Sequence, residues 1–237
     1  MSLLNEENSF YNIDLLNLLK DSSEAVLPYK RIRFRRNQQI LAEGAETDYF
    51  YIIEDGVVSM SKNTCKEDSI INFLGKQECI GPLTLLGGAK SPVNYTTISE
   101  VSVYQFERKY VLNKFLSSPD VFWQMNALMQ SMVTPMLERE GYVNLPSSEK
   151  VLAGLIACGE RFGRIESDGS CLIPYYFTQK ILGNYLNLAR AYVATNLRKL
   201  EEDGIIALSP KPWRVNNFEI HKQKTKRKSR TLHMSAK

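Results

Sequence analysis

The chain has 237 residues, of which 43% are hydrophobic and 24% charged, and its formal net charge is +4. These values are typical of a soluble globular protein of one or two domains. The sequence contains no run of about eighteen apolar residues and no basic start followed by an apolar run, so we expect neither a membrane span nor a secretory signal. Both absences favour a cytoplasmic protein.

Cysteine and histidine are too scattered to predict a metal centre. The four cysteines form no C-x-x-C pair and no cluster, which argues against a zinc knuckle, a redox pair and an iron–sulfur cluster. They are Cys65, Cys79, Cys158 and Cys171. We interpret them as reduced, partly buried thiols, with a single redox-sensing thiol as the alternative. Both histidines, His221 and His233, lie in a basic C-terminal segment, so a histidine-based metal site is not expected.

Positive charge collects at the C-terminal end of the chain. Residues 1–115 carry a net charge of −2, whereas residues 215–237 carry a net charge of +6. We therefore expect a polyanion to be bound at the C-terminal end.

The first 117 residues combine a helical lead-in with a series of short strands. Residues 1–28 contain an amphipathic segment that ends near Pro28. From residue 30 to residue 107, runs of β type are separated by turn signals such as Glu43-Gly44 and Glu54-Asp55-Gly56. Many short strands at this spacing predict a β-barrel, a sandwich or a jelly-roll-like roll. The predicted strands are Arg31–Arg35, Gln39–Leu41, Tyr49–Ile53, Val57–Ser61, Ser69–Phe73, Tyr95–Ser99 and Val101–Phe106.

A long helix is predicted to begin at Ser118-Pro119-Asp120, where a capping residue, a proline and an acidic residue follow one another. Apolar residues follow at spacings of three and four, which is typical of a coiled-coil seam. The seam residues are Phe122, Met125, Met129, Met132 and Met136. We interpret the seam as the contact of a homodimer, and the alternative is packing on the chain's own β domain. Because Pro135 removes a helical hydrogen bond, we expect the helix to kink or end there and the seam to run from 119 to about 134.

The remainder of the chain is predicted to alternate helices with short strands. Residues 144–148 favour a hinge, and a helix is predicted over Glu149–Phe162. Turns and a short strand are expected from Arg164 to Pro174, and a hairpin over Ser209–Val215. We expect the last twenty residues to be disordered, and the alternative is an extra arm that adds phosphate contacts.

Residues 177–200 predict two short helices joined by a tight turn. Thr178 suits the N-cap of the first helix, and Asn187 lies where the turn needs a left-handed residue. Val193 and Leu197 face the core from the second helix, whose other side carries polar and basic groups. This layout is typical of a helix-turn-helix DNA-binding motif, and an ordinary helical hairpin is the alternative.

Two kinds of DNA contact are predicted from this motif. Arg190 lies near the N-terminus of the second helix, where an arginine can donate two hydrogen bonds to guanine O6 and N7. Other side chains are placed to contact phosphates, which position a protein without specifying a sequence. The predicted phosphate contacts are Thr178, Gln179, Lys180, Tyr192, Arg198, Lys199, Lys211 and Arg214, the last two from a hairpin that would form a wing.

The chain resembles the Crp/Fnr family of bacterial transcription regulators over nearly its whole length. The resemblance rests on the turn signals of the roll, on Cys79–Leu83, on the helix start at Ser118 and above all on Thr178–Ile206. It implies a homodimer that places two reading helices in successive major grooves of a near-palindromic site.

The roll departs from the pattern of family members that bind cyclic AMP. Those members carry a glutamate after the glycine that corresponds to Gly81, Arg-Ser at the cyclic phosphate and Thr-Ser at the adenine. This chain has Pro82, Pro92-Val93 and Met136-Leu137 there. An anionic phosphate needs a positive charge or several donors, so cyclic AMP is not expected. The cysteine cluster of the oxygen-sensing branch and the haem histidine of the carbon monoxide branch are also missing, so neither an iron–sulfur cluster nor haem is expected.

The reading helix departs from the family pattern too. Family members commonly carry Arg-Glu, with a second arginine four residues after the glutamate. Here Arg190 is kept, and Ala191 and Thr195 hold the other two base-reading positions. Ala191 cannot accept a hydrogen bond from cytosine N4, but it can contact a thymine methyl group. The half-site is therefore expected to differ from the usual TGTGA and TTGAT sequences.

These observations predict an α+β chain of four parts. An antiparallel, jelly-roll-like β-roll spans 1–117, a dimerisation helix and hinge span 118–145, a winged helix-turn-helix domain spans 146–218, and a basic tail spans 219–237. We interpret the chain as a transcription regulator without enzymatic activity or a cofactor. It would bind double-stranded DNA as a homodimer, with RNA polymerase as a partner if it activates, and the sequence leaves its effector open.

Two other interpretations remain open. One is a module that uses the winged helix to bind a partner protein. The other is a cupin-like β-roll enzyme with an attached DNA module, which would need a histidine and glutamate metal cluster. Residues 30–107 contain no histidine.

Overall fold

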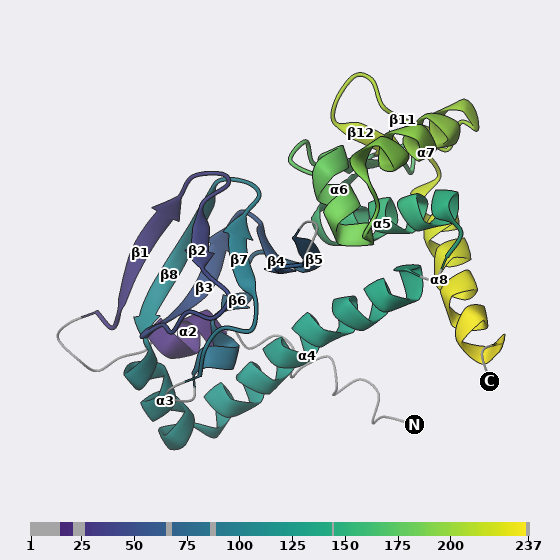
Figure 1. Ribbon diagram of the computed structural model, residues 1–237. Coiled ribbons are helices and arrows are strands. Elements are labelled where there is room, and N and C mark those ends of the chain that lie inside the picture. The colour runs from purple at the N-terminus through teal and green to yellow at the C-terminus, as the bar shows by residue number, and fades with distance from the viewer. Residues whose placement is uncertain (1–14, 21–26, 65–67, 86–88, 144, 236–237) are drawn as a thin grey trace. The chain divides into compact units, whose positions relative to one another are not determined.

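The computed structural model describes residues 15–20, 27–64, 68–85, 89–143 and 145–235. The chain divides into two compact units (Figure 1). The first comprises Met1–Asn63 and Asn72–Thr134, and the second comprises Thr64–Ile71 and Pro135–Lys237. Strand β5 (Ser69–Leu74) and helix α4 (Pro119–Val143) each run from one unit into the other.

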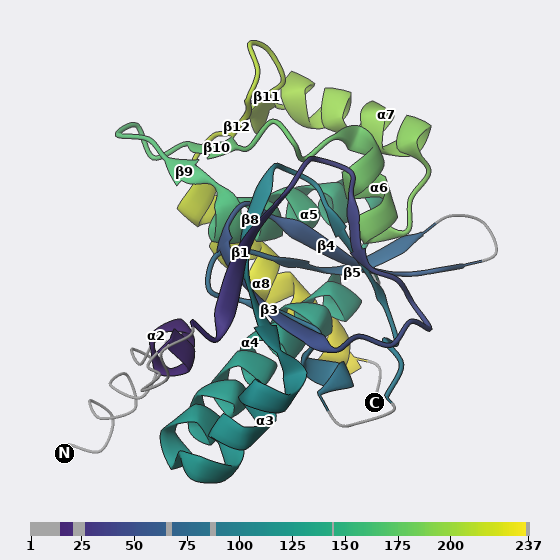
Figure 2. The same ribbon diagram turned by 90° about the vertical axis from the view of Figure 1, so that its left-hand side faces the viewer.

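The first unit is built on two four-stranded sheets whose described pairings are antiparallel. One sheet has the order β1-β8-β3-β6 and the other β2-β7-β4-β5. This arrangement confirms the predicted roll (Figure 2). The strands are β1 (Tyr29–Phe34), β2 (Gln39–Leu41), β3 (Tyr49–Asp55), β4 (Val58–Lys62), β5, β6 (Cys79–Ile80), β7 (Asn94–Thr97) and β8 (Val101–Glu107).

Alternation of side chains along the strands fills the interior of the roll. Strand β8 buries Val101 and Val103 and leaves Ser102 and Tyr104 half-buried, because successive side chains point to opposite faces. The turn after β3 requires Gly56, whose φ is +94° and where a Cβ would collide with the carbonyl oxygen of Glu100. The largest fully buried side chains of the unit include Phe50, Ile52, Ile53, Leu74, Ile80, Tyr95 and Phe106.

Helices cover the ends of this unit. Helix α2 (Leu15–Lys20) belongs to the predicted lead-in and buries Leu15 and Leu19; residues 1–14 and 21–26 of the lead-in lie outside the described residues. Helix α3 (Arg108–Ser117) and the short 3-10 helix η1 (Pro82–Thr84) were not predicted. Val111 is the buried residue of α3, although Leu112, Phe115 and Leu116 are also apolar.

Helix α4 begins at Pro119 as predicted, with Asp120 in its first turn. Of the two outcomes expected at Pro135, a kink or an end of the helix, the end is wrong, because the helix continues through Pro135 to Val143. A proline inside a helix removes one hydrogen bond, and the rest of this long helix remains paired. The division between the two units falls directly before Pro135.

The second unit packs four helices against a small sheet of order β11-β12-β10-β9. The helices are α5 (Ser147–Phe162), α6 (Gln179–Leu186), α7 (Arg190–Glu202) and α8 (Phe218–Ser235). The strands are β9 (Arg164–Ile165), β10 (Cys171–Ile173), β11 (Ile206–Ala207) and β12 (Trp213–Val215). Buried side chains from all four helices and the sheet form the core, including Leu155, Leu182, Leu186, Val193, Leu197, Val215 and Phe218.

The basic tail forms a helix, so the expectation of disorder is wrong for most of it. Helix α8 packs against α5, with Phe218 2% and Thr225 7% exposed. The Nζ atoms of Lys222 and Lys226 lie 3.3 and 2.8 Å from a carboxylate oxygen of Glu160. The burial of Phe218 and Thr225 and the ion pairs with Glu160 stabilise this helix, although its composition is typical of a solvated segment.

None of the helices in the described ranges is long and apolar enough to cross a membrane.

Candidate nucleic-acid interface

Helix α6 and the turn after it adopt the predicted geometry. Thr178 is the N-cap, and its Oγ1 accepts a hydrogen bond from the Ile181 N–H at 3.3 Å. Asn187 ends the helix with φ 54° and ψ 43°, the left-handed conformation expected of it. The turn also depends on Gly183, where a Cβ would lie 2.6 Å from the Leu188 carbonyl oxygen. The role of Gly183 was not predicted, since a glycine inside a short helix carries no local signal of such a close approach.

Helix α7 divides into a buried face and an exposed face. Val193, Leu197 and Leu200 are buried against the core, as predicted. Arg190, Ala191 and Thr195 are all exposed. At about 100° per residue, these three positions span about 140° of the helix surface, so they lie together on one side. The three predicted base-reading residues therefore share a face that a DNA groove can reach.

Two polar groups of α7 are partly used within the helix. The Thr195 hydroxyl donates to the Ala191 carbonyl at 3.1 Å, and the Asn196 amide donates to the Tyr192 carbonyl at 2.8 Å. Thr195 can therefore present its methyl group and an acceptor oxygen to a base, but its hydroxyl hydrogen is already bonded. Asn196 is 5% exposed and belongs to the core side.

Most of the predicted phosphate-contacting side chains surround this face. Lys180, Tyr192, Arg198, Lys199 and Lys211 are exposed, and Thr178 and Gln179 at the start of α6 are half-buried. Strands β11 and β12 form the predicted wing, and Lys211 lies in the loop between them. Exposed cations on α6, α7 and the wing are what binding to a phosphate backbone requires.

Arg214 of the wing is already engaged. Its Nη1 lies 2.9 Å from a carboxylate oxygen of Asp168 and 3.0 Å from the Ser170 hydroxyl. Hydrogen bonds from Ser170, together with the charge of Arg214, lower the pKa of Asp168, so this carboxylate is ionised at neutral pH. A phosphate would have to compete with Asp168 for this arginine.

The predicted dimer seam divides between two faces of α4. Met125 and Met132 are 7% and 4% exposed, which agrees with the alternative that the helix packs on its own β domain. Phe122 is 51% exposed, and Met129 and Met136 are half-buried. Val133 and Leu137, which the seam did not include, are 47% and 66% exposed.

The helical geometry relates these two sets of residues. At about 100° per residue, Met125 and Met132 lie about 60–80° to one side of Phe122, whereas Val133 and Leu137 lie about 20–60° to the other. The exposed apolar stripe of α4 is therefore rotated away from the predicted seam.

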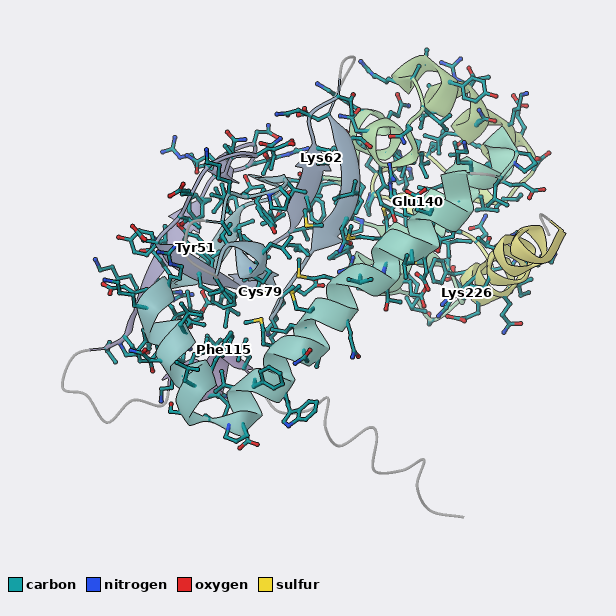
Figure 3. All side chains as sticks on the ribbon, turned by 60° about the horizontal axis from the view of Figure 1, so that its bottom comes forward. Tyr51, Lys62, Cys79, Phe115, Glu140 and Lys226 are labelled. Carbon is teal, nitrogen blue, oxygen red and sulfur yellow. The ribbon has the colours of Figure 1, made fainter. Side chains whose placement is uncertain are left out.

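The buried cysteines lack the features of reactive thiols. Cys79, which Figure 3 places among the strands of the roll, is fully buried, and burial raises its pKa to about 12. Burial also raises the pKa of Cys158, and that of Cys171 to about 11. A thiol protonated at neutral pH is a poor nucleophile and a poor redox sensor. Cys65 lies outside the described residues.

Comparisons with known proteins agree with this architecture. Residues 31–118 match the model of the cyclic nucleotide-binding domain. The chain is 23% identical over 223 residues to the global nitrogen regulator of Synechococcus elongatus, a match that covers 91% of this chain and 96% of that protein. The chain thus matches this regulator along almost the whole of both sequences.

Solved structures share the fold of this chain. FixK2 from Bradyrhizobium japonicum is similar with a TM-score of 0.69 and 19% identity, covering 83% of this chain and 97% of that one. A transcriptional regulator of the Crp/Fnr family from Thermus thermophilus is similar with a TM-score of 0.68 and 14% identity, covering 83% of this chain and 98% of that one. These likenesses establish the order of β-roll, long helix and winged helix.

The roll offers little to an anionic phosphate near Pro92. The Nζ of Lys62 lies 2.9 Å from the Pro92 carbonyl oxygen, but it also lies 2.7 Å from a carboxylate oxygen of Glu43. The hydrogen bond from Lys62, with one from the Asn63 N–H, lowers the pKa of Glu43, which therefore stays ionised and neutralises the lysine. Val93 is buried and apolar.

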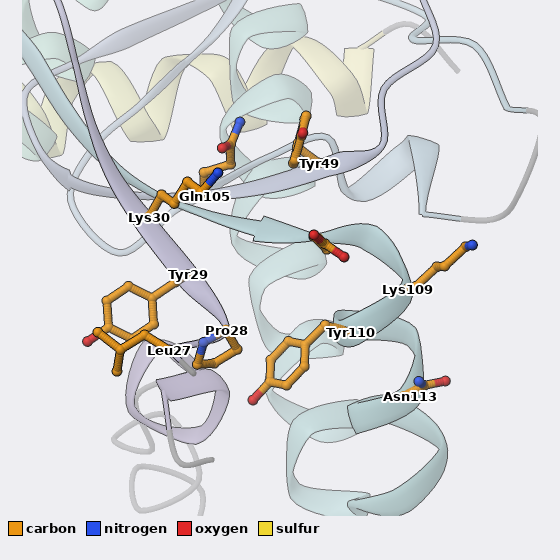
Figure 4. A pocket seen from close by; sticks show the side chains of 10 residues that line it. Leu27, Pro28, Tyr29, Lys30, Tyr49, Gln105, Lys109, Tyr110 and Asn113 are labelled. Carbon is orange, nitrogen blue, oxygen red and sulfur yellow. The ribbon is translucent and has the colours of Figure 1, made fainter. Parts of the chain in front are cut away.

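A surface pocket of about 440 Å³ lies in the first unit between β1, β8 and α3 (Figure 4). Lys30 and Gln105 lie at one side of it, and Tyr110 and Asn113 lie at the other. Lys109 extends away from Lys30, and Glu107 is among the residues that line the pocket. The two lysines do not converge on one point, so this pocket is not built as a phosphate site.

Proposed function

We propose that this chain is a sequence-specific, DNA-binding transcription regulator that acts as a homodimer on a near-palindromic site. The proposal rests on the exposed face of α7. Arg190, Ala191 and Thr195 lie on this face, whereas Val193, Leu197 and Leu200 are buried in the core. Exposed basic residues on α6, α7 and the wing supply the phosphate contacts that such reading needs.

Binding to genomic DNA fragments tests this function directly. The full chain should shift a subset of fragments in a gel assay. Arg190→Ala should lower affinity for those fragments by about 1–3 kcal/mol, which is roughly 5- to 150-fold, and relax the base preference at one position of each half-site. Arg33→Ala, an exposed arginine of β1, is the matched control and should leave the shift unchanged. A chain that binds no fragment, or an Arg190→Ala variant with unchanged affinity and preference, would contradict the proposal.

The homodimer is proposed to form along the exposed stripe of α4. Phe122, Val133 and Leu137 are large apolar side chains that a monomer leaves in water. A second copy of the same helix would cover them, as expected for an interface with an apolar centre.

Cyclic AMP is proposed not to be the effector. The lysine near Pro92 is paired with Glu43, and the motif positions hold Pro82, Pro92 and Val93. Thermal unfolding with the nucleotide present should show no stabilisation. A bound ligand at a hundred times its Kd would add about 2.7 kcal/mol, which would be a clear rise in Tm, and such a rise would overturn the proposal.

The tail is proposed to add phosphate contacts through basic residues other than Lys222 and Lys226. Those two lysines are paired with Glu160 and hold α8 on α5. The basic residues left for such an arm are the exposed Lys224 and, further along the sequence, Arg227, Lys228 and Arg230. RNA polymerase would be a further partner if the regulator activates transcription.

A further inference from the structure

Arg139, in the last turns of α4, is a charged side chain that is almost completely buried. Its side chain is 4% exposed. A guanidinium removed from water is costly unless acceptors surround it. Burial lowers the pKa of Arg139, although an arginine remains protonated at neutral pH. The identity of its acceptors therefore shows what the residue holds in place.

The first acceptor is the end of α6. The Nε of Arg139 donates to the Tyr185 carbonyl oxygen at 2.7 Å. Tyr185 is in the last turn of α6, where an α-helix leaves its final carbonyls without intrahelical partners. A cation at this end also interacts favourably with the helix dipole. The Arg139 guanidinium lies 5.7 Å from the centre of the Tyr185 ring. Arg139 thus caps the first helix of the helix-turn-helix.

The second acceptor is the turn residue itself. The Nη2 of Arg139 donates to the Asn187 side-chain oxygen at 3.1 Å and to the Ser69 hydroxyl at 3.1 Å. The Ser69 hydroxyl in turn donates to the same Asn187 oxygen at 2.8 Å. Ser69 lies in Thr64–Ile71, which belongs to the same compact unit as Arg139 and Asn187. Three residues far apart in sequence therefore close a ring of hydrogen bonds on the left-handed residue.

This ring supplements a short covalent connection. Between α4 and α5 the chain has only residues 144–146, and α6 follows much later. A buried cluster of Tyr142, Leu145 and Ala153 also links the end of α4 to α5, but it does not contact the turn residue itself. Arg190 begins α7 three residues after Asn187, so a turn fixed to α4 also fixes the start of the reading helix.

We propose that Arg139 is a positioning residue for DNA reading: it locks the turn of the helix-turn-helix to the end of α4 and so sets the orientation of Arg190, Ala191 and Thr195 relative to that helix. The inference rests on the proposed function. In a dimer held together by α4, it makes Arg139 the residue that sets the separation of the two reading helices and hence the preferred half-site spacing.

The test uses half-site spacing, which a purely structural role would not affect. One base pair inserted between half-sites rotates one of them by about 34–36° relative to the other. The full chain is measured against its selected site, against the same half-sites one base pair closer or further apart, and against a single half-site. The variants are Arg139→Met, which keeps an unbranched apolar stem but removes the charge and the hydrogen-bond donors, and Arg139→Lys, which keeps the charge.

The wild-type chain should bind the selected spacing much more tightly than either altered spacing. Arg139→Met should lower affinity for the selected site by about tenfold, because orientation is no longer fixed before binding. Its preference between spacings should shrink by a similar factor, while binding to the single half-site stays unchanged. Arg139→Lys should restore part of the preference. Arg31→Met, at an exposed arginine of β1 paired with Glu54, should behave as wild type.

Each outcome bears on the proposal. A variant that loses the same affinity on every DNA, with an unchanged spacing preference, would overturn it, and so would a variant identical to wild type. If Arg139→Met does not fold, the test uses Asn187→Gly instead. Glycine keeps the left-handed turn and removes the acceptor of the Arg139 hydrogen bond. The Asn187→Gly chain must then show the reduced preference between half-site spacings. A wild-type chain that binds no DNA would refute the proposed function and this inference together, whereas wild-type binding with normal spacing preference in the variants would refute the inference alone.

Discussion

At the scale of single residues, the helix-turn-helix shows which roles a sequence reveals. Thr178 and Asn187 could be predicted, because capping and left-handed conformation depend on the chemistry of one side chain and its nearest neighbours. Gly183 and Arg139 could not, because each matters through groups brought close by the fold. The Leu188 carbonyl oxygen leaves no room for a Cβ at Gly183. The Tyr185 and Asn187 oxygens accept the hydrogen bonds that Arg139 donates.

The close approach at Gly183 leads to a stability prediction. Gly183→Ala should lower the free energy of unfolding by about 1–3 kcal/mol, because the new Cβ would lie 2.6 Å from a backbone oxygen that cannot move without opening the turn. Chemical denaturation of the full chain measures the effect. Asn184→Ala, at the next position of α6, is the control and should change the value by about 0.5 kcal/mol or less. Equal stability of Gly183→Ala and wild type would show that the turn relaxes freely.

At the scale of elements, local signals located the main strands and helices, and packing decided the rest. The start of α4 and the strands of the roll could be predicted from caps, turns and periodicity. Helix α3 has a single buried residue, and α8 has a composition typical of a solvated tail. Helix α8 is recognisable only from its packing on α5, where Glu160 forms ion pairs with Lys222 and Lys226.

The anchoring of α8 gives a prediction with a defined pH dependence. Burial tends to raise the pKa of Glu160, but the hydrogen bonds and charges of Lys226 and Lys222 outweigh it, so the pKa is lowered in the folded state. The stabilisation is therefore present above the unfolded pKa of about 4.3 and is lost as pH falls through the folded value. Glu160→Gln should cost about 0.2–1 kcal/mol at pH 7, because these pairs are partly exposed.

The measurement is unfolding of wild type and Glu160→Gln between pH 7 and pH 3. The difference between them should disappear at the acidic end. Glu219→Gln, whose carboxylate lies 3.6 Å from Lys222 and is 64% exposed, should have the smaller effect at pH 7. A Glu160→Gln difference that persists unchanged at pH 3 would show that the charge of Glu160 is not what anchors α8.

At the scale of the whole molecule, α4 shows why an apolar pattern does not identify its own partner. The spacing of three and four correctly indicates a helix with an apolar stripe, but two surfaces compete for such a stripe. Met125 and Met132 are buried within the chain, whereas Phe122, Val133 and Leu137 are exposed. The order of roll, long helix and winged helix could be predicted, because each part carries its own local signals.

The exposed stripe predicts the effect of charge on assembly. Val133→Glu combined with Leu137→Glu should raise the dimer dissociation constant by at least about thirtyfold, since it buries carboxylates at the centre of the proposed interface. Sedimentation of the full chain measures the change, and thermal unfolding confirms that the monomer still folds. Ser131→Glu, at an exposed position of α4 about 180° around the helix from Phe122, should leave the assembly as in wild type. A dimer that survives the double substitution would place the interface elsewhere.

The interleaving of the two compact units has a practical consequence for building chimaeras. Because Thr64–Ile71 belongs with Pro135–Lys237, no single cut in the chain separates a complete reader from a complete roll. A reader transplanted from residue 135 onward would arrive without Ser69, and so without one member of the ring that holds Asn187. A working graft therefore has to carry Thr64–Ile71 as a second inserted piece.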